Sequence, residues 1–490
     1  MNKIHSILKA IPAALASALL ASCAVFGPSR TPPAMNAPAQ YSVAPSSAPR
    51  LAMGASPVAR WWQAYSSPQL DDLVNEALEH NQSLAAATAN LKAAHEQVRE
   101  QVGENLVPHV DVGFSPTRQR ALGIPVLPQQ TFLYNVFAAE VQGSWTLDFF
   151  GASVMADRAL LSQVRAQAYG LEAARRSVAF NVVLATINAA SLQAQLDALT
   201  RYADAAERRS RQMRDRFESG SASHVEVLEA DEAAAEAQRL LPPLHRQLLG
   251  VRHAEAVLLG RTPDQAPAPL RLEDLHLPET LPVAVPSELL HQRPDILAAE
   301  ETVRASADAA GAASASLFPS LTLSAAYGRG GFDWSTFASP AGAVWSVGAS
   351  LTQPLFHGGA LHARARQYQD TYEASLAQYR QTVLTAFQSV ADTLVALEDD
   401  AREIEQTQRS ADALKTIQDE VQGRYEAGSA DAYTVLGAQS QYQAAYVTYV
   451  AARAARLSDS AALLDAMGNP GVPVAGATVA MRQSAQEAKP

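Results

Sequence analysis

The stretch Arg216-Phe-Glu-Ser-Gly-Ser-Ala-Ser-His-Val-Glu-Val-Leu-Glu-Ala230 decides the fold, because it recurs 208 positions later as Arg424-Tyr-Glu-Ala-Gly-Ser-Ala-Asp-Ala-Tyr-Thr-Val-Leu-Gly-Ala438. Eight of the fifteen positions are identical without a gap, including Gly220 with Gly428. A period this long is one half of a protein rather than a short solenoid unit. The chain is therefore predicted to contain two copies of one structural unit.

Each copy is predicted to contain a hairpin of very long helices, at about 152–219 and 222–260 in the first copy and about 360–427 and 430–467 in the second. Residues 129–241 and 355–469 contain no proline, and 360–422 contain no glycine. A 68-residue helix would be ~100 Å long. Apolar residues follow the 4-3-4-3 spacing of a coiled-coil seam. They are Val383, Phe387, Val390, Leu394 and Leu397, with Phe180, Leu184, Ile187, Ala194 and Ala198 in the first copy.

Gly220 and Gly428 are predicted to reverse the chain at the two hairpin tips, because glycine tolerates positive φ at the end of a helix. Ser221 or Ser223 in the first copy can cap the returning helix. Ser429 or Asp431 can do so in the second.

Four segments alternate apolar and polar residues with period two, which predicts strands at about 108–118, 135–149, 319–328 and 344–356. Loops at about 116–134 and 329–343 join each pair. Strands of about ten residues can cross a bilayer when tilted, although an alternating strand also suits a soluble sheet. Four strands cannot close a membrane barrel, which needs about eight, so a membrane sheet would have to be shared between subunits.

The N-terminus is predicted to be a lipoprotein signal peptide, residues 1–22. Lys3 and Lys9 precede a short apolar run, and Leu20-Ala21-Ser22-Cys23 reads as a lipobox. Cys23 is the only cysteine, which excludes an internal disulfide and makes it the predicted lipidation site. Ala24 follows it where retention in the inner membrane would favour aspartate, so the anchor is expected in the outer membrane.

Composition shifts divide the chain further. Residues 23–59, rich in Pro, Ala and Ser, are predicted to form a flexible tether, and the Pro-rich stretch 262–286 to link repeat 1 (60–261) to repeat 2 (287–468). Residues 469–490 are predicted to be a flexible tail.

The composition argues against several classes of function. A net charge of −11 disfavours a nucleic-acid partner. There is no phosphate-binding GxxxxGK[ST] loop, no HExxH and no clear metal-ligand spacing among the eleven histidines. The chain is predicted not to be an enzyme and to bind no cofactor or metal.

Several motifs together resemble the TolC-like outer-membrane efflux proteins, in their lipoprotein subgroup, over about residues 60–470. One run is Gln292-Arg293-Pro294-Asp295-Ile296, followed by Ala298-Ala299-Glu300 and Phe318-Pro319-Ser320. Another is Arg424-Tyr425-Glu426-Ala427-Gly428 with Leu436, Ala438 and Gln439.

The resemblance implies an α+β membrane protein: a homotrimer with a 12-stranded outer-membrane β-barrel continued by a long periplasmic α-helical barrel. It also implies the exit duct of a tripartite efflux pump, in which a periplasmic adaptor docks on the helical tips and an inner-membrane transporter supplies energy. The adaptor-contacting residues would be Ser219, Gly220, Ser221, Ala427, Gly428 and Ser429. A type I protein secretion channel and a lipid-anchored periplasmic scaffold remain alternatives, and the exported substrate stays open.

The second tip departs from the family pattern. Relatives commonly read Leu-Asp-Ala-Gln-Arg there, whereas this chain reads Leu436-Gly437-Ala438-Gln439-Ser440. Any acidic ring at the periplasmic aperture would therefore come from the first repeat, or these carboxylates form an ordinary solvated helix face. The aperture candidates are Glu229, Asp231, Glu232 and Tyr433.

Overall fold

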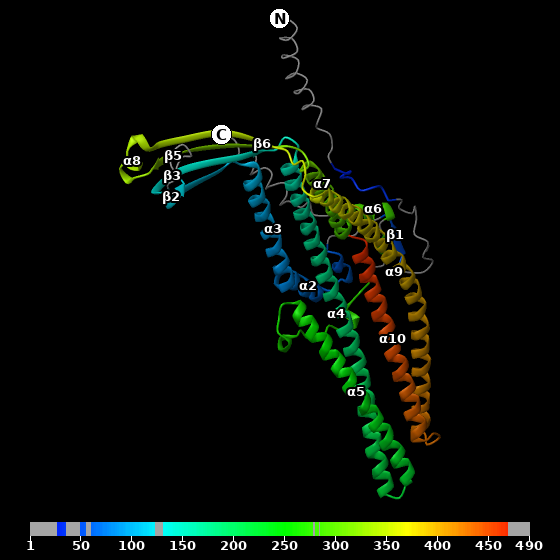
Figure 1. Cartoon of the computed structure of the whole chain (residues 1–490). Coiled ribbons are helices and arrows are strands. Elements are labelled where there is room, and N and C mark those ends of the chain that lie inside the picture. Colours follow the sequence, from blue (N-terminus) through cyan, green and yellow to red (C-terminus); the bar gives the residue numbers. More distant parts are fainter. Residues whose placement is uncertain are drawn as a thin grey trace. The chain divides into compact units, whose positions relative to one another are not determined.

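The computed structural model describes residues 27–35, 50–54, 60–122, 131–277, 280–283 and 285–468 (Figure 1). The chain divides into two compact units. Unit 1 contains residues 1–34, 90–167 and 299–379, and unit 2 contains residues 35–89, 168–298 and 380–490. The predicted signal peptide, Cys23 and the tail 469–490 lie outside the described residues.

The long helices repeat with the same offset of 208 residues as the sequence motif. Helices α4 (Ala152–Glu218) and α5 (His224–Leu258) correspond to α9 (Ala360–Glu426) and α10 (Ala432–Ala466), with 67 and 35 residues in each pair. Gly220 and Gly428 both have φ of +74°. The duplication therefore extends through the whole helical hairpin rather than its tip alone.

The returning helices begin two residues later than predicted, because Ser223 and Asp431 are the caps. Ser223 forms a capping box: its hydroxyl accepts from the Glu226 amide at 3.2 Å, and its own amide donates to the Glu226 carboxylate at 2.6 Å. The Asp431 carboxylate accepts from the Thr434 amide at 2.7 Å. Each cap satisfies an amide that the first helical turn leaves unpaired.

Two prolines distinguish the hairpins. Pro242 and Pro243 lie inside α5, whereas the corresponding residues of α10 are Val450 and Ala451. A proline removes one backbone hydrogen bond and clashes with the preceding turn. The two copies therefore share helix boundaries but not the same internal bonding.

In α9, most residues of the predicted seam are buried. In α4, the buried apolar surface is broader than the predicted seam. Val383, Val390, Leu394 and Leu397 are each at most 3% exposed. In α4, the fully buried residues include Val182 and Val183 beside the predicted seam. One stretch of α4 is apolar enough to span a membrane by length and composition, but 56% of it is buried within the chain, as in a core helix.

Unit 1 contains an antiparallel sheet of order β2-β3-β5-β6. Strands β2 (His109–Leu122) and β3 (Thr131–Leu147) extend into the predicted loop, and β6 (Ala343–Thr352) ends before residue 356. Between β5 (Ser320–Gly331) and β6, the predicted loop contains helix α8 (Trp334–Ala338) and the short turn η4 (Pro340–Gly342). Unit 1 also contains most of α3 (Gln82–Leu106) and of α7 (Pro294–Ala315).

Parts of the predicted tether and of the linker form regular secondary structure, so the tether is not flexible over its whole length. Strand β1 (Arg50–Met53) pairs in parallel with β4 (Thr280–Val283) in unit 2. The linker also contains the short turns η2 (Pro263–Gln265) and η3 (Leu272–Asp274). Backbone pairing and buried leucines hold these segments despite their proline content.

The core of unit 2 forms around the turn η1 (Trp61–Tyr65) and helix α2 (Pro68–His80). Tyr65 is fully buried, and its hydroxyl donates to the Leu457 carbonyl at 2.7 Å. Glu76 accepts two hydrogen bonds of 2.6 Å from Arg261. These contacts fasten the first residues of repeat 1 to both repeats of the chain.

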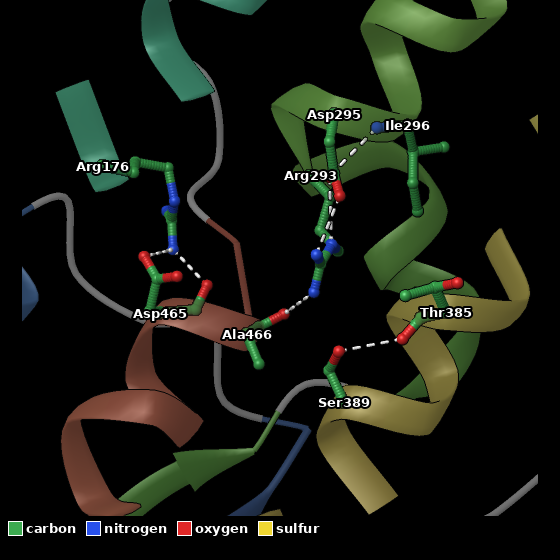
Figure 2. Close-up of polar contacts among 8 residues, drawn as sticks. All are labelled: Arg176, Arg293, Asp295, Ile296, Thr385, Ser389, Asp465 and Ala466. Carbon is green, nitrogen blue, oxygen red and sulfur yellow. Dashed lines mark hydrogen bonds and ion pairs between the residues drawn. The ribbon is translucent and has the colours of Figure 1, made fainter. Parts of the chain in front are cut away.

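Two arginines cap the end of α10 (Figure 2). Arg176 donates to the backbone carbonyl of Asp465, and Arg293 donates to the carbonyl of Ala466 at 2.8 Å. Arg293 also pairs with Asp295 at 2.8 Å. A cation at a helix C-terminus complements the helix dipole and satisfies carbonyls that have no partner within the helix. Arg293, just after α6 (Pro286–Gln292), therefore joins the start of α7 to the end of α10.

A carboxyl pair links α9 to α10. Asp400 is 8% exposed and hydrogen-bonds Asp459. Burial, followed by the charge of Asp459, raises the pKa of Asp400 to about 7; Glu403 also raises it and Arg456 opposes them. The corresponding residues of the first hairpin, at an offset of 208, are Leu192 and Val251. The fold therefore accepts an apolar pair at this level of the hairpin.

The pair predicts that stability falls as pH rises. Because the pKa of Asp400 is higher in the folded state than its ordinary 3.8, its stabilising contribution is complete below about pH 4 and is lost as pH rises through about 7. Asp400→Asn should keep a donor to Asp459 and raise the melting temperature at pH 8 more than at pH 5. Circular dichroism melting curves between these pH values measure the effect. Asp399→Asn, at an exposed neighbour, is the control, and parallel profiles for wild type and Asp400→Asn would contradict the prediction.

Candidate functional site

One face of the four-stranded sheet is apolar and open. In register across the strands, Val112 faces Val141, Val141 faces Tyr327, and Tyr327 faces Trp345. Val112 is 82% exposed and Trp345 is 74% exposed. A continuous exposed apolar face of this kind marks a surface for lipid or for a partner protein. We call it the apolar face.

The opposite face is polar. Three of the four residues in one row are polar, namely Asp111, Gln142 and Ser346, and the fourth is Ala326. Nearer the strand ends, the hydroxyls of Thr146 and Thr322 lie 3.1 Å apart in a hydrogen bond. Alternation of apolar and polar residues along each strand is the pattern of a membrane barrel with a wet interior. The sheet can therefore separate lipid from water.

The hairpin tips repeat the same backbone bonds. The Ser221 amide donates to the Arg216 carbonyl at 2.7 Å, and the Ser429 amide donates to the Arg424 carbonyl at 2.8 Å. These bonds from beyond the helix to its last turn require the positive φ of Gly220 and Gly428. Both tips are exposed.

A cleft of 210 Å³ lies between the two helical hairpins in unit 2. The acidic residues Glu226, Glu229 and Asp431 line it, together with Tyr433, which is 65% exposed. Leu436 also lines the cleft, and it packs with residues of α4 and α5 in one apolar cluster. The lining of the cleft combines acidic and apolar residues, so it suits a partner that carries both positive charge and apolar surface.

Arg209 joins the two hairpins. Its guanidinium lies 4.9 Å from the centre of the Tyr425 ring and donates to the Gln422 side chain and the Ala432 carbonyl, both at 3.3 Å. Burial lowers the pKa of Arg209. Nearer the tip, Arg216 donates to the Tyr425 hydroxyl at 3.4 Å. Sequence reasoning missed Arg209 because no local pattern indicates a partner more than 200 residues away.

The structure separates the predicted aperture residues. Asp231 accepts from the Ser210 hydroxyl at 2.5 Å and from Arg214 at 2.7 Å, and these hydrogen bonds lower the pKa of its carboxyl. Its charge is therefore matched within the first hairpin. Glu229 and Tyr433 lie together in the cleft, whereas Glu232 is exposed outside it.

Comparisons with known proteins agree with this arrangement. The chain matches the family model of the outer membrane efflux proteins over residues 73–260 and 285–469. The pyoverdine export outer membrane protein OpmQ of Pseudomonas aeruginosa is 30% identical over 92% of this chain and 96% of its own. The toluene efflux pump outer membrane protein TtgC of Pseudomonas putida is 28% identical over 93% and 94%. The Campylobacter jejuni CmeC outer membrane channel, 22% identical, shares the fold with a TM-score of 0.82 over 94% of this chain and 99% of that one.

A sheet with one lipid-compatible face, together with paired long helical hairpins, defines the subunit of an outer-membrane channel. The chain belongs to the outer membrane efflux protein family. Its fold is that of the TolC-like trimeric channels, which confirms the family and the fold class predicted from the sequence. Among the described residues, no group of three histidine, cysteine or carboxylate side chains could hold a metal ion.

The two faces of β6 predict opposite effects of the same charge. Val347 lies on the apolar face, and its neighbour Ser346 lies on the polar face. An arginine on the lipid side of a barrel costs about 2–4 kcal/mol near the bilayer midplane. Val347→Arg should therefore reduce the heat-resistant trimer in outer-membrane fractions on gel electrophoresis, whereas Ser346→Arg should leave it near wild type. Equal losses in the two variants would show that the faces are assigned wrongly.

Proposed function

We propose that this protein is the outer-membrane exit duct of a tripartite pump that expels small toxic compounds. The observation that carries the proposal is the sheet, apolar on one face and polar on the other, with two strand edges that only further copies of the chain can close. Relatives named for pyoverdine export and toluene efflux support small molecules as the cargo. They favour efflux over protein secretion and over a periplasmic scaffold.

The acidic cleft supports docking of a periplasmic adaptor on the hairpin tips, through which an inner-membrane transporter would connect to the duct. The tip residues Ser219, Gly220 and Ser221 are exposed, as are Gly428 and Ser429. Cationic side chains of an adaptor would meet Glu226 and Glu229 in the cleft, where charge complementarity increases the rate of association. In this proposal the adaptor contacts both hairpins of one subunit at the same time.

The course of the N-terminal segment supports a lipid anchor at Cys23. Gly27 lies against Gly311 of α7, where a Cβ on Gly27 would come within 2.9 Å of the Gly311 Cα. Arg30 pairs with the buried Asp308 at 3.1 Å. Gly311 is close to the end of α7, which leads into β5, and Cys23 is within ~14 Å of Gly27 along the chain. An acyl chain on Cys23 would thus start near the periplasmic ends of the membrane strands.

Deletion of the gene tests the proposal most directly. Loss of an efflux duct should increase susceptibility across a panel of antibiotics, dyes and organic solvents, and the wild-type gene should restore resistance. Minimum inhibitory concentrations measure the effect, with intracellular accumulation of a fluorescent dye as a second readout. Unchanged susceptibility together with a lost secreted protein would instead favour the secretion channel.

Separate substitutions distinguish an aperture carboxylate from a structural one. Glu229→Gln should weaken block of single channels by divalent cations severalfold, because it removes a carboxylate that faces the cleft. Asp231→Asn should leave block unchanged and destabilise the hairpin by about 1 kcal/mol or less, as expected for a partly exposed ion pair. Planar-bilayer recordings and thermal melts measure the two effects. Cation block that responds to Asp231→Asn and not to Glu229→Gln would reverse these roles.

A further inference from the structure

The connection between β5 and β6 is a fixed element rather than an open loop. Asp333 caps the start of helix α8, because its carboxylate accepts from the Thr336 amide at 2.8 Å. The helix ends at Ala338, whose carbonyl accepts from Arg329 of β5 at 2.6 Å. Both ends of a five-residue helix are thereby capped.

The connection lies close against the sheet. A Cβ on Gly331 would come within 2.7 Å of the Phe337 amide nitrogen, and one on Gly342 within 2.5 Å of the Thr336 carbonyl oxygen. Only glycine permits both approaches without a shift of the backbone. The position of α8 is therefore determined by the same chain that forms the strands.

Helix α8 packs on the apolar face. The Phe337 ring lies 6.1 Å from the Phe114 ring and 6.2 Å from the Phe137 ring, between ring centres, and Trp334 lies 5.9 Å from Phe137. In the strand register, Phe114 faces Ala139, two residues from Val112 and from Val141. The aromatic rings of α8 thus continue the surface formed by Val112, Val141, Tyr327 and Trp345.

Aromatic surface remains open around α8. Trp334 is 61% exposed and Phe332 is 69% exposed. Figure 1 shows α8 at the end of the sheet where β5 turns into β6. The opposite strand ends continue into the long helices, so α8 occupies the extracellular end of the barrel.

We propose that α8 is an aromatic anchor that inserts into the outer leaflet of the outer membrane, with lipid as its partner. The proposal rests on the proposed function as an outer-membrane channel. Tryptophan is favoured at the boundary between headgroups and acyl chains, where its ring is buried and its N–H remains hydrated. Trp334 takes this boundary position, and the rings of Phe332 and Phe337 lie beside it. A helix lying on the lipid side of the strands, rather than over the pore, then fixes the height of the barrel in the bilayer.

Quenching of tryptophan fluorescence by brominated phosphatidylcholine tests the anchor in full-length protein reconstituted in vesicles. The emission of Trp334 is obtained by subtracting the emission of Trp334→Phe from that of the wild type. The emission of Trp345, on the apolar face, is obtained in the same way with Trp345→Phe. Lipid brominated near the headgroup should quench Trp334 by at least half of its emission, and aqueous iodide should quench it less than the lipid does.

The outcomes separate this proposal from the proposed function. Quenching of Trp345 by lipid, with Trp334 quenched only by iodide, would overturn the anchor and leave the channel intact. Trp334 protected from both quenchers would also overturn it, because a neighbouring copy would then cover α8. Failure of brominated lipid to quench either tryptophan would contradict the membrane channel itself. Ser335→Ala alters α8 without removing an aromatic ring. Brominated lipid should quench the tryptophan emission of this variant as much as that of the wild type.

Discussion

The two open edges of the membrane sheet constrain the rest of the structure. Within the described chain, β2 pairs only with β3, and β6 pairs only with β5. Each unpaired backbone group in lipid costs several kilocalories per mole, and water is absent to satisfy it. An isolated copy of this sheet therefore cannot remain in a bilayer, whatever the quality of its apolar face. Pairing β6 of one copy with β2 of the next removes both edges, and the family's trimer completes a closed barrel in this way.

The two repeats share the same helix boundaries but differ in their buried side-chain contacts. The helix boundaries repeat at 208 residues, yet the buried pair Thr186–Glu255 of the first hairpin, joined at 2.6 Å, corresponds to Leu394 and Leu463 in the second. The second hairpin contains the Asp400–Asp459 pair, whose counterparts in the first hairpin are the apolar Leu192 and Val251. These two buried acidic contacts therefore lie at different levels of the two hairpins. The same helical hairpin can hold either an apolar or a polar pair at these positions. Helix packing depends on side-chain shape, and a buried polar group is tolerated where its hydrogen-bond partner is present.

Local periodicity allowed the four strands of the membrane sheet and the four long helices to be predicted, because strand alternation, long proline-free segments and paired glycines act within a few residues. The turns at Gly220 and Gly428 required only a residue that accepts positive φ, and the alternation from Phe137 to Leu147 required only one lipid-facing side. Contacts between distant segments could not be predicted in this way. The pairing of β1 with β4 and the contact of Arg209 with Tyr425 depend on chain paths that no local pattern encodes. Asp231 resembled a free carboxylate because its partners, Ser210 and Arg214, lie on the other helix of the hairpin.

Contacts between the hairpins also differ in how strongly they oppose separation of the tips. Arg216 is exposed and Tyr425 is half-buried, so water can replace their hydrogen bond at little cost. Arg209 is 8% exposed, and its guanidinium has two hydrogen bonds and an aromatic ring around it. Removing these partners would leave a buried cation without compensation, which is far more costly than losing a surface contact. Of these two polar contacts, the one at Arg209, about two helical turns behind Arg216, therefore opposes separation of the two hairpins more strongly than the one at the tip, and the apolar cluster around Leu436 would have to open with it.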